Sequence, residues 1–336
     1  MQGRGPKPGT MKAILCRAFG PPGDLRLEET ASPKLGATGL RIEVHSAGLN
    51  FPDVLIVQGK YQVKPEFPFS PGAEVAGIVT EVGERAPGFA VGDRVMALCT
   101  TGGFAEEAVV HYGSAFKMPD GMAFDTAAAL PLTYGTSYHA LIDRAKLSTG
   151  ETLLVTGAGG GVGIAAVQIG KALGATVIAA AGSAEKLAAA REAGADHGID
   201  YTTENLAERV KALTSQAGAN VVYDAVGGDI FDAALRCVAW EGRLLVIGFA
   251  SGRIPEIPAN RLLLKGCSAV GVYWGAFAAR DPAANRHNFE HIFRLYADGK
   301  IDPKIGAVYS LADAAQSIVD LENRAIVGKA VIRVRP

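Results

Sequence analysis

The segment Leu153–Gly163 constrains the fold of this chain more than any other. It reads LLVTGAGGGVG, an apolar run that enters a glycine-rich turn and continues into a helical pattern. Such a turn lets the backbone approach a pyrophosphate, and the amino terminus of the following helix offers N–H groups to an anion. Ala158 stands where the first glycine of the G-x-G-x-x-G pattern belongs. The segment predicts either a tight structural turn or a dinucleotide site formed by Gly157, Gly159, Gly160, Gly161, Val162 and Gly163.

The pattern around this turn predicts an α/β fold. From residue 153 onward, short apolar strands alternate with helical segments, which is typical of a parallel sheet covered on both faces. Before residue 125 the chain has short strands separated by Gly and Pro, as in a compact β-rich domain. The composition changes near residue 125 and again near 277. We therefore expect a compact β-rich domain in the first third of the chain, a doubly wound parallel-sheet domain after it, and a return to mixed structure from about residue 277.

Composition excludes several classes of protein. Lys and Arg number 33 against 34 Asp and Glu, so no excess of positive charge is available to bind nucleic-acid phosphates. No apolar run reaches 18 residues, the length of a membrane span. Residues 1–10 have no apolar core, so we expect a disordered tail rather than a secretory signal. The cysteines are too far apart for a disulfide framework or a cysteine-based zinc site, which indicates a cytoplasmic protein; they are Cys16, Cys99, Cys237 and Cys267.

The end of the second expected strand indicates NADPH rather than NADH. An acidic residue there would bind the ribose 2′-hydroxyl of NAD, but residues 179–182 read AAAG. Ser183 and Lys186 follow, and a hydroxyl with a lysine suits a 2′-phosphate. Glu185 argues against this, and Lys186 could also be an ordinary exposed helix lysine. We also expect Ser183 to be the N-cap of the next helix.

Several short motifs give the chain a family resemblance. They are Gly48–Asp53 (GLNFPD), Pro71–Gly77 (PGAEVAG), Val91–Val95 (VGDRV), the glycine turn and Gly328-Lys329. With these motifs the chain resembles the zinc-free NADPH:quinone oxidoreductases (zeta-crystallin-like) of the medium-chain dehydrogenase/reductase superfamily. The resemblance implies a GroES-like catalytic domain built from both ends of the chain, at 1–131 and 277–336. It implies a Rossmann domain that binds NADPH inserted between them, at 132–276, and a homodimer formed through the last Rossmann strand, expected at 267–274.

The resemblance also implies roles for individual residues. Asn50 and Tyr61 are the candidate catalytic residues. Candidate cofactor contacts outside the turn and the Ser183–Lys186 segment are Asn50, Thr133, Ser137, Tyr201, Gly248, Phe249, Ala250, Arg324 and Lys329. Residues 248–250 follow a strand at its carboxyl end, where open α/β sheets bind ligands. Capping or packing roles are the alternatives for Asn50, Tyr61, Thr133, Ser137, Tyr201, Arg324 and Lys329.

We expect no metal. Zinc-dependent relatives carry a cysteine near the position of Asn50 and a histidine at the position of Ala73, and neither residue here supplies sulfur or imidazole. The run His287–His291 (HNFEH) has the spacing of an inverted zincin motif. No third ligand is evident, so a solvated helix face is the simpler interpretation.

The expected activity is NADPH-dependent reduction of quinones or related conjugated carbonyls. Without a Lewis acid to polarise an isolated carbonyl, such a site favours acceptors that delocalise the incoming electrons. One alternative is an enoyl or acryloyl double-bond reductase, which could act on CoA-linked substrates. A second alternative is an NADPH-binding protein with little catalysis.

Overall fold

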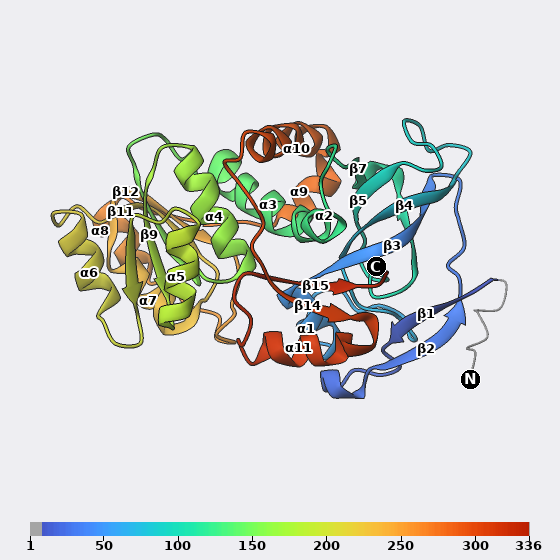
Figure 1. Cartoon of the computed structure of the whole chain (residues 1–336). Coiled ribbons are helices and arrows are strands. Elements are labelled where there is room, and N and C mark those ends of the chain that lie inside the picture. Colours follow the sequence, from blue (N-terminus) through green and yellow to red (C-terminus); the bar gives the residue numbers. More distant parts are fainter. Residues whose placement is uncertain (1–8, 336) are drawn as a thin grey trace. The chain divides into compact units, whose positions relative to one another are not determined.

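The computed structural model describes residues 9–335 and divides into two compact units (Figure 1). The first unit contains the chain up to residue 132 together with residues from 305 onward, and the second contains 133–304. The first boundary lies within one residue of the expected one. The second lies at 304/305 rather than 276/277. The expected tail at 1–10 lies outside the described residues up to residue 8, whereas Thr10 already begins strand β1.

The second boundary is shifted because two helices after residue 273 pack within the second unit. They are α9 (Trp274–Arg280) and α10 (Pro282–Ala297). The indole nitrogen of Trp274 donates to Asn285 Oδ1 at 3.0 Å, and Asn288 Nδ2 donates to Asp143 Oδ2 at 2.8 Å. These contacts join α10 to α9 and to the segment that leads into the parallel sheet.

The first unit is the β-rich one. Its mixed sheet has the order β14-β15-β3-β4-β5-β7, with β6 also paired to β3, beside an antiparallel pair β1-β2. The strands are β1 (Thr10–Leu15), β2 (Arg26–Ala31), β3 (Gly39–Leu49), β4 (Glu74–Val82), β5 (Arg94–Leu98), β6 (Glu107–His111), β7 (Ala115–Lys117), β14 (Ile305–Ser310) and β15 (Lys329–Arg333). The helical segments are η1 (Pro22–Asp24), α1 (Phe51–Val57), η2 (Tyr112–Ser114), α2 (Phe124–Ala129), η4 (Leu311–Asp313) and α11 (Ala314–Glu322).

The second unit is a parallel sheet of order β10-β9-β8-β11-β12-β13. Its strands are β8 (Thr152–Thr156), β9 (Thr176–Ala181), β10 (His197–Asp200), β11 (Ala219–Asp224), β12 (Val238–Val246) and β13 (Ser268–Gly271). Its other helical segments are α3 (Pro131–Tyr138), η3 (His139–Arg144), α4 (Gly161–Ala172), α5 (Ala184–Glu192), α6 (Leu206–Leu213), α7 (Gly228–Leu235) and α8 (Ala259–Lys265). From β8 the chain proceeds to β9 and β10 in one direction, and from β11 to β12 and β13 in the other. The strand order therefore reverses between β8 and β11.

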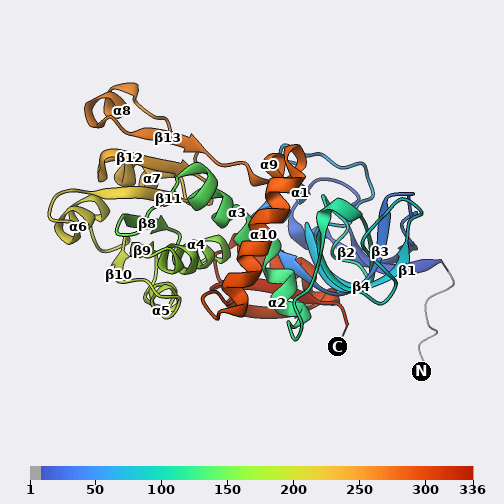
Figure 2. The same cartoon turned by 90° about the horizontal axis from the view of Figure 1, so that it is seen from above.

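Four helices of the second unit pack against one another in two pairs. Helix α4 lies beside α5, and α6 lies beside α7 (Figure 2). Because parallel crossovers are right-handed, the reversal of strand order places the two pairs on opposite faces of the sheet. Open α/β sheets bind ligands at the carboxyl ends of the strands where the strand order reverses, which here are β8 and β11.

Two expected strands of the second unit differ from the structure. The apolar pattern predicts a helix over 229–238 and a strand over 243–247, but strand β12 is longer and already begins at Val238. Glu241 and Gly242 lie inside this strand and break its apolar run in the sequence. Glu241 also has φ +54°, which is unusual in a strand. The last strand ends at Gly271 and does not reach 274, because Trp274 begins α9.

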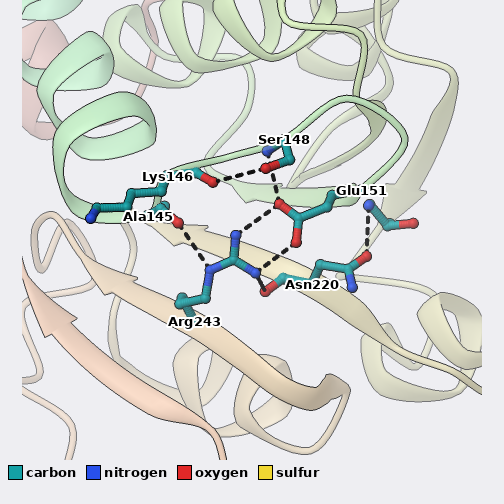
Figure 3. A network of polar contacts seen from close by, with 7 residues as sticks. Ala145, Lys146, Ser148, Glu151, Asn220 and Arg243 are labelled. Carbon is teal, nitrogen blue, oxygen red and sulfur yellow. Dashed lines mark hydrogen bonds and ion pairs between the residues drawn. The ribbon is translucent and has the colours of Figure 1, made fainter.

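An arginine network fixes the opposite, amino-terminal edge of the sheet (Figure 3). Arg243 on β12 donates through both terminal nitrogens to Glu151, at 2.8 and 2.7 Å, and through Nε to Ala145 O at 3.0 Å. Glu151 also accepts from Ser148 N at 2.9 Å. A bidentate Arg–carboxylate pair is strong and directional. This network therefore holds the loop before β8 against β12, at the edge of the sheet opposite the carboxyl ends of the strands.

Candidate active site

The glycine turn lies at the carboxyl end of β8, as expected. Gly157 has φ +65°, a conformation that L side chains rarely adopt, and α4 begins at Gly161 with Gly160 as its N-cap. A Cβ atom added to Gly163 would lie 2.3 Å from Gly157 O and 2.7 Å from Ala158 Cα. Gly163 is therefore glycine because the helix packs directly on the turn.

Gly160 has a different role. An added Cβ there would meet only Gly157 O, at the ordinary contact distance of 3.6 Å. No side chain caps the amino terminus of α4. The protein's own packing thus does not require glycine at 160, but a phosphate seated on the helix terminus does. Because the backbone is open at Gly160, the turn fits a bound dinucleotide.

The structure brings Ser183 and Lys186 to the same turn. A Cβ on Gly159 would lie 2.4 Å from Lys186 Cβ, so the lysine stem packs against the turn. Ser183 caps α5, and its Oγ accepts from Lys186 N at 3.3 Å. The ring of Tyr201 lies 3.1 Å from the Cβ position of Gly182. These three expected residues and the glycine turn therefore lie near one another at the carboxyl ends of β8, β9 and β10.

Asp224 is a buried acid at this edge of the sheet that was not predicted from the sequence. It ends β11, is fully buried, and accepts from Thr156 Oγ1 at 2.5 Å and from Gly227 N at 2.9 Å. Burial raises the pKa of its carboxyl, and these hydrogen bonds oppose the rise. An acid that closes an apolar strand before Gly227-Gly228 is the signal that could have identified it. It joins the ends of β8 and β11 where the strand order reverses.

The loop after β12 lies beside the loop after β11. Ala250 N donates to Ala225 O at 3.2 Å, and Ser251 N donates to Val226 O at 2.8 Å. Phe249 lies 3.1 Å from the Cβ position of Gly227. The expected segment 248–250 is thus placed at the carboxyl edge of the sheet.

Ser137 and Thr133 lie on α3 and are buried. Ser137 Oγ donates to Val162 O at 3.0 Å and lies 2.9 Å from the hydroxyl of Tyr223. Burial raises the pKa of this Tyr223 hydroxyl. Ser137 therefore joins α3 to the first turn of α4, which is one of the structural roles left open by the sequence.

In the first unit, Asn50, Glu74 and Lys329 form a buried polar network. Glu74 and Lys329 have side chains only 0% and 5% exposed, and Lys329 Nζ lies 2.6 Å from Glu74 Oε1. Asn50 Nδ2 donates to the same Glu74 oxygen at 2.7 Å, and its Oδ1 accepts from Lys329 Nζ. Glu74 Oε2 accepts from Leu132 N at 2.8 Å. Residues from α1, β4 and β15 thus converge on one pair of opposite charges.

Asp53 stands directly beside this network. Its carboxyl accepts from Asn50 N at 2.8 Å and from Gly72 N at 3.0 Å, and it forms a capping box with Asn50 at the start of α1. Burial raises its pKa to about 7, although both backbone donors and Lys329 act in the opposite direction. Cys99 Sγ donates to Gly72 O at 3.3 Å, and burial raises the pKa of this thiol. Neither the place of Cys99 beside this network nor the pairing of Glu74 with Lys329 was predicted from the sequence.

The structure places two expected residues elsewhere in the first unit. Tyr61 follows α1 and packs against the apolar core. Arg324 is exposed after α11 and has φ +60°. Among the residues from 9 to 335, no group of three or more His, Cys, Asp or Glu side chains is arranged to hold a metal ion. Within the same range, no helix is long and apolar enough to cross a membrane.

Comparison with known proteins defines the class. The model for the alcohol dehydrogenase GroES-like domain matches residues 36–120, and the model for the zinc-binding dehydrogenase matches 161–294. A GroES-like domain joined to a Rossmann-type domain is the arrangement of medium-chain dehydrogenases/reductases, so this expectation about the fold is confirmed.

Individual relatives narrow the class further. The chain is 44% identical over 328 residues to the quinone oxidoreductase-like protein 2 homolog of Nematostella vectensis, covering 96% of this chain and 89% of that protein. It superposes with a TM-score of 0.90 and 32% identity on the quinone oxidoreductase of Pseudomonas syringae pv. Tomato DC3000, and with 0.89 and 29% on the Escherichia coli quinone oxidoreductase complexed with NADPH. Each superposition covers 96% of this chain and 100% of the other. The chain belongs to the quinone oxidoreductase family of medium-chain dehydrogenases/reductases.

Proposed function

We propose that this protein is an NADPH-dependent, zinc-free oxidoreductase that reduces quinones or related conjugated carbonyls. The observation that carries the proposal is the turn at 157–163, which is open at Gly160 and flanked by Lys186. The names of the relatives as quinone oxidoreductases support it. In this proposal the second unit binds the coenzyme.

The residues of the second unit favour the phosphorylated coenzyme. When bound, NADPH supplies a hydride from the nicotinamide C4. The helix terminus at Gly160–Val162 would hold the pyrophosphate. The Ser183 hydroxyl and the Lys186 ammonium would hold the 2′-phosphate, since residues 179–182 carry no acid to repel it.

The network in the first unit favours a delocalised acceptor. Asn50 and Ala73 occupy the positions of zinc ligands in related dehydrogenases, and neither provides a zinc donor. Asn50 is instead held by Glu74 and Lys329, whose charges offset one another. We propose that this network keeps α1 and the Gly72 loop in place beside the acceptor, and that quinones and enones suit such a site because they spread the incoming charge over a conjugated system.

The proposal is tested by NADPH oxidation at 340 nm with a panel of acceptors: a benzoquinone, an enone and an enoyl-CoA. We expect turnover with the quinone. Turnover restricted to the enone or the enoyl-CoA would replace quinone reduction with double-bond reduction. NADPH binding without turnover of any acceptor would leave an NADPH-binding protein.

We also propose a homodimer formed through β13. This strand lies at the end of the sheet order, and Leu263, Leu264 and Tyr273 beside it are 79%, 73% and 56% exposed. An uncovered edge strand with apolar neighbours tends to pair with another strand, and a second copy offers the same edge.

We also propose that the protein is located in the cytoplasm. Cys16, Cys99, Cys237 and Cys267 are free thiols in the structure. Free thiols suit a reducing compartment, which supports the cytoplasm.

A further inference from the structure

His287 and His291 lie one helical turn apart on the exposed part of α10. Residues four apart share one face of a helix, and here the two rings have centroids 4.6 Å apart. Their Nε2 atoms lie 3.2 Å apart, within hydrogen-bond distance, and a metal ion held by both would take the place of that hydrogen bond. The sequence motif showed only the spacing; the structure adds that the two nitrogens converge.

This separation matches a shared metal ion. Two imidazole nitrogens bound tetrahedrally to one zinc ion at 2.0–2.1 Å lie about 3.3 Å apart. The observed 3.2 Å agrees with that value. Imidazole is a preferred ligand of zinc and copper, so both donor type and donor spacing are suitable.

Glu290 supports the ligand role of His287. Its Oε2 lies 3.3 Å from His287 Nδ1. In a neutral imidazole this contact places the proton on Nδ1 and leaves the lone pair of Nε2 for a metal. A carboxylate behind the ligating histidine is the usual arrangement around protein-bound zinc.

Two features limit the strength of the site. Arg294 lies on the following turn, with Nε 3.3 Å from Glu290 O, and its positive charge opposes a cation. The protein also supplies two ligands rather than three or four, so water fills the other positions. From this geometry we infer that His287 and His291 form a two-ligand surface site for divalent transition cations such as Zn²⁺ and Cu²⁺. This inference does not depend on the proposed function.

The test is a zinc titration of the full chain, purified without a polyhistidine tag and freed of metal by a chelator. Isothermal calorimetry of the wild type should show one saturable site per chain. His287→Ala and His291→Ala should each weaken it at least about tenfold, because the second histidine binds intramolecularly once the first holds the ion. His287 is exposed and His291 is half-buried beside the ring of Tyr138. Alanine favours the helix at both positions, so the variants should fold, which circular dichroism verifies.

His111→Ala is the matched control, because His111 is an exposed histidine with no second histidine one turn away. It should bind zinc like the wild type. Zinc should also raise the unfolding midpoint of the wild type but not of the His287→Ala/His291→Ala variant, since a ligand stabilises only a fold that binds it. A wild type without saturable binding, or a double variant that binds zinc equally well, would overturn the inference.

Discussion

Glu74 and Lys329 are a buried ion pair, and such pairs are costly to break on one side. Removal of one partner leaves the other charge buried without compensation, at a cost of about 3–5 kcal/mol. Lys329→Met should therefore lower the free energy of unfolding by that amount in urea denaturation. The matched control is Lys171→Met, because Lys171 pairs with Asp196 and both side chains are about one-third exposed; such a surface pair contributes about 0–1 kcal/mol.

The double variant Glu74→Gln/Lys329→Met separates the charge from the packing. It removes both charges and should recover part of the stability lost in Lys329→Met. Equal destabilisation by Lys329→Met and Lys171→Met would show that the network at Asn50 does not depend on the buried pair.

Asp53 should give the protein an unusual pH dependence. The unfolded chain loses this proton near pH 3.8, whereas the folded protein keeps it until about pH 7. Between these values the folded state binds the extra proton, so this contribution to stability falls as the pH rises, by about 1.4 kcal/mol per unit, and is lost above pH 7. Urea denaturation from pH 4.5 to 8.5 should show this fall in the wild type relative to Asp53→Asn. A difference between the two proteins that stays constant with pH would contradict the assignment.

Two glycines in the turn between β8 and α4 have different roles. Gly163 is required by packing, whereas Gly160 leaves room for a ligand. Gly163→Ala places a Cβ 2.3 Å from a backbone oxygen, so we expect a loss of stability of about 1–3 kcal/mol. Gly160→Ala meets no such obstacle within the protein and has φ −89°, which alanine adopts readily. It should keep the unfolding midpoint and lose NADPH affinity at least about tenfold, as measured by fluorescence titration.

Gly23→Ala is the control for these variants, since a Cβ there meets nothing within 4 Å. Its stability and NADPH affinity should match the wild type. If Gly160→Ala bound NADPH normally, the phosphate would not be seated on this helix terminus.

Elements with a strong periodic pattern could be predicted from the sequence. The apolar run at 74–82 predicts a strand, which β4 forms with the same bounds, and Ser183 caps α5 as expected. Short elements could not be predicted in this way. Helix α1 has only seven residues and begins at Phe51-Pro52, and its start is fixed by Asp53, whose partner Gly72 is distant in the sequence. The start of strand β12 was predicted wrongly because Glu241 and Gly242, the first of which has positive φ, interrupt the apolar run of the strand.

The candidate site of the second unit could be predicted because each of its parts is a short continuous segment of the sequence. The glycine turn and Ser183–Lys186 each form a short segment attached to one strand end, and the parallel sheet brings those ends together. The network of the first unit could not be predicted, because Asn50, Glu74 and Lys329 come from three distant elements that only the mixed sheet aligns. Sequence motifs indicated Asn50 and Lys329 but not their mutual contact, which uses both ends of the Asn50 amide.

At the scale of the whole molecule, the exposed apolar surface next to β13 should control assembly. Leu263→Glu/Leu264→Glu places two charges beside the edge strand, where they would have to be buried in a dimer. We expect the wild type to be a dimer and this variant a monomer by light scattering at micromolar concentration. Val91→Glu, at an exposed apolar residue of the first unit, is the control and should leave the dimer intact. A wild-type monomer would contradict the proposed interface.

We propose that the second unit selects NADPH for the reduction of a quinone. The most direct test compares kcat/KM for NADPH and NADH, with one quinone acceptor, in the wild type and in Lys186→Ala. The wild type should prefer NADPH at least about tenfold, since a charge-assisted contact to the 2′-phosphate contributes about 1.5–3 kcal/mol. Lys186→Ala should lose most of that preference through a lower kcat/KM for NADPH, with the value for NADH unchanged. Equal use of the two coenzymes by the wild type, or a preference that survives Lys186→Ala, would contradict this account of the site.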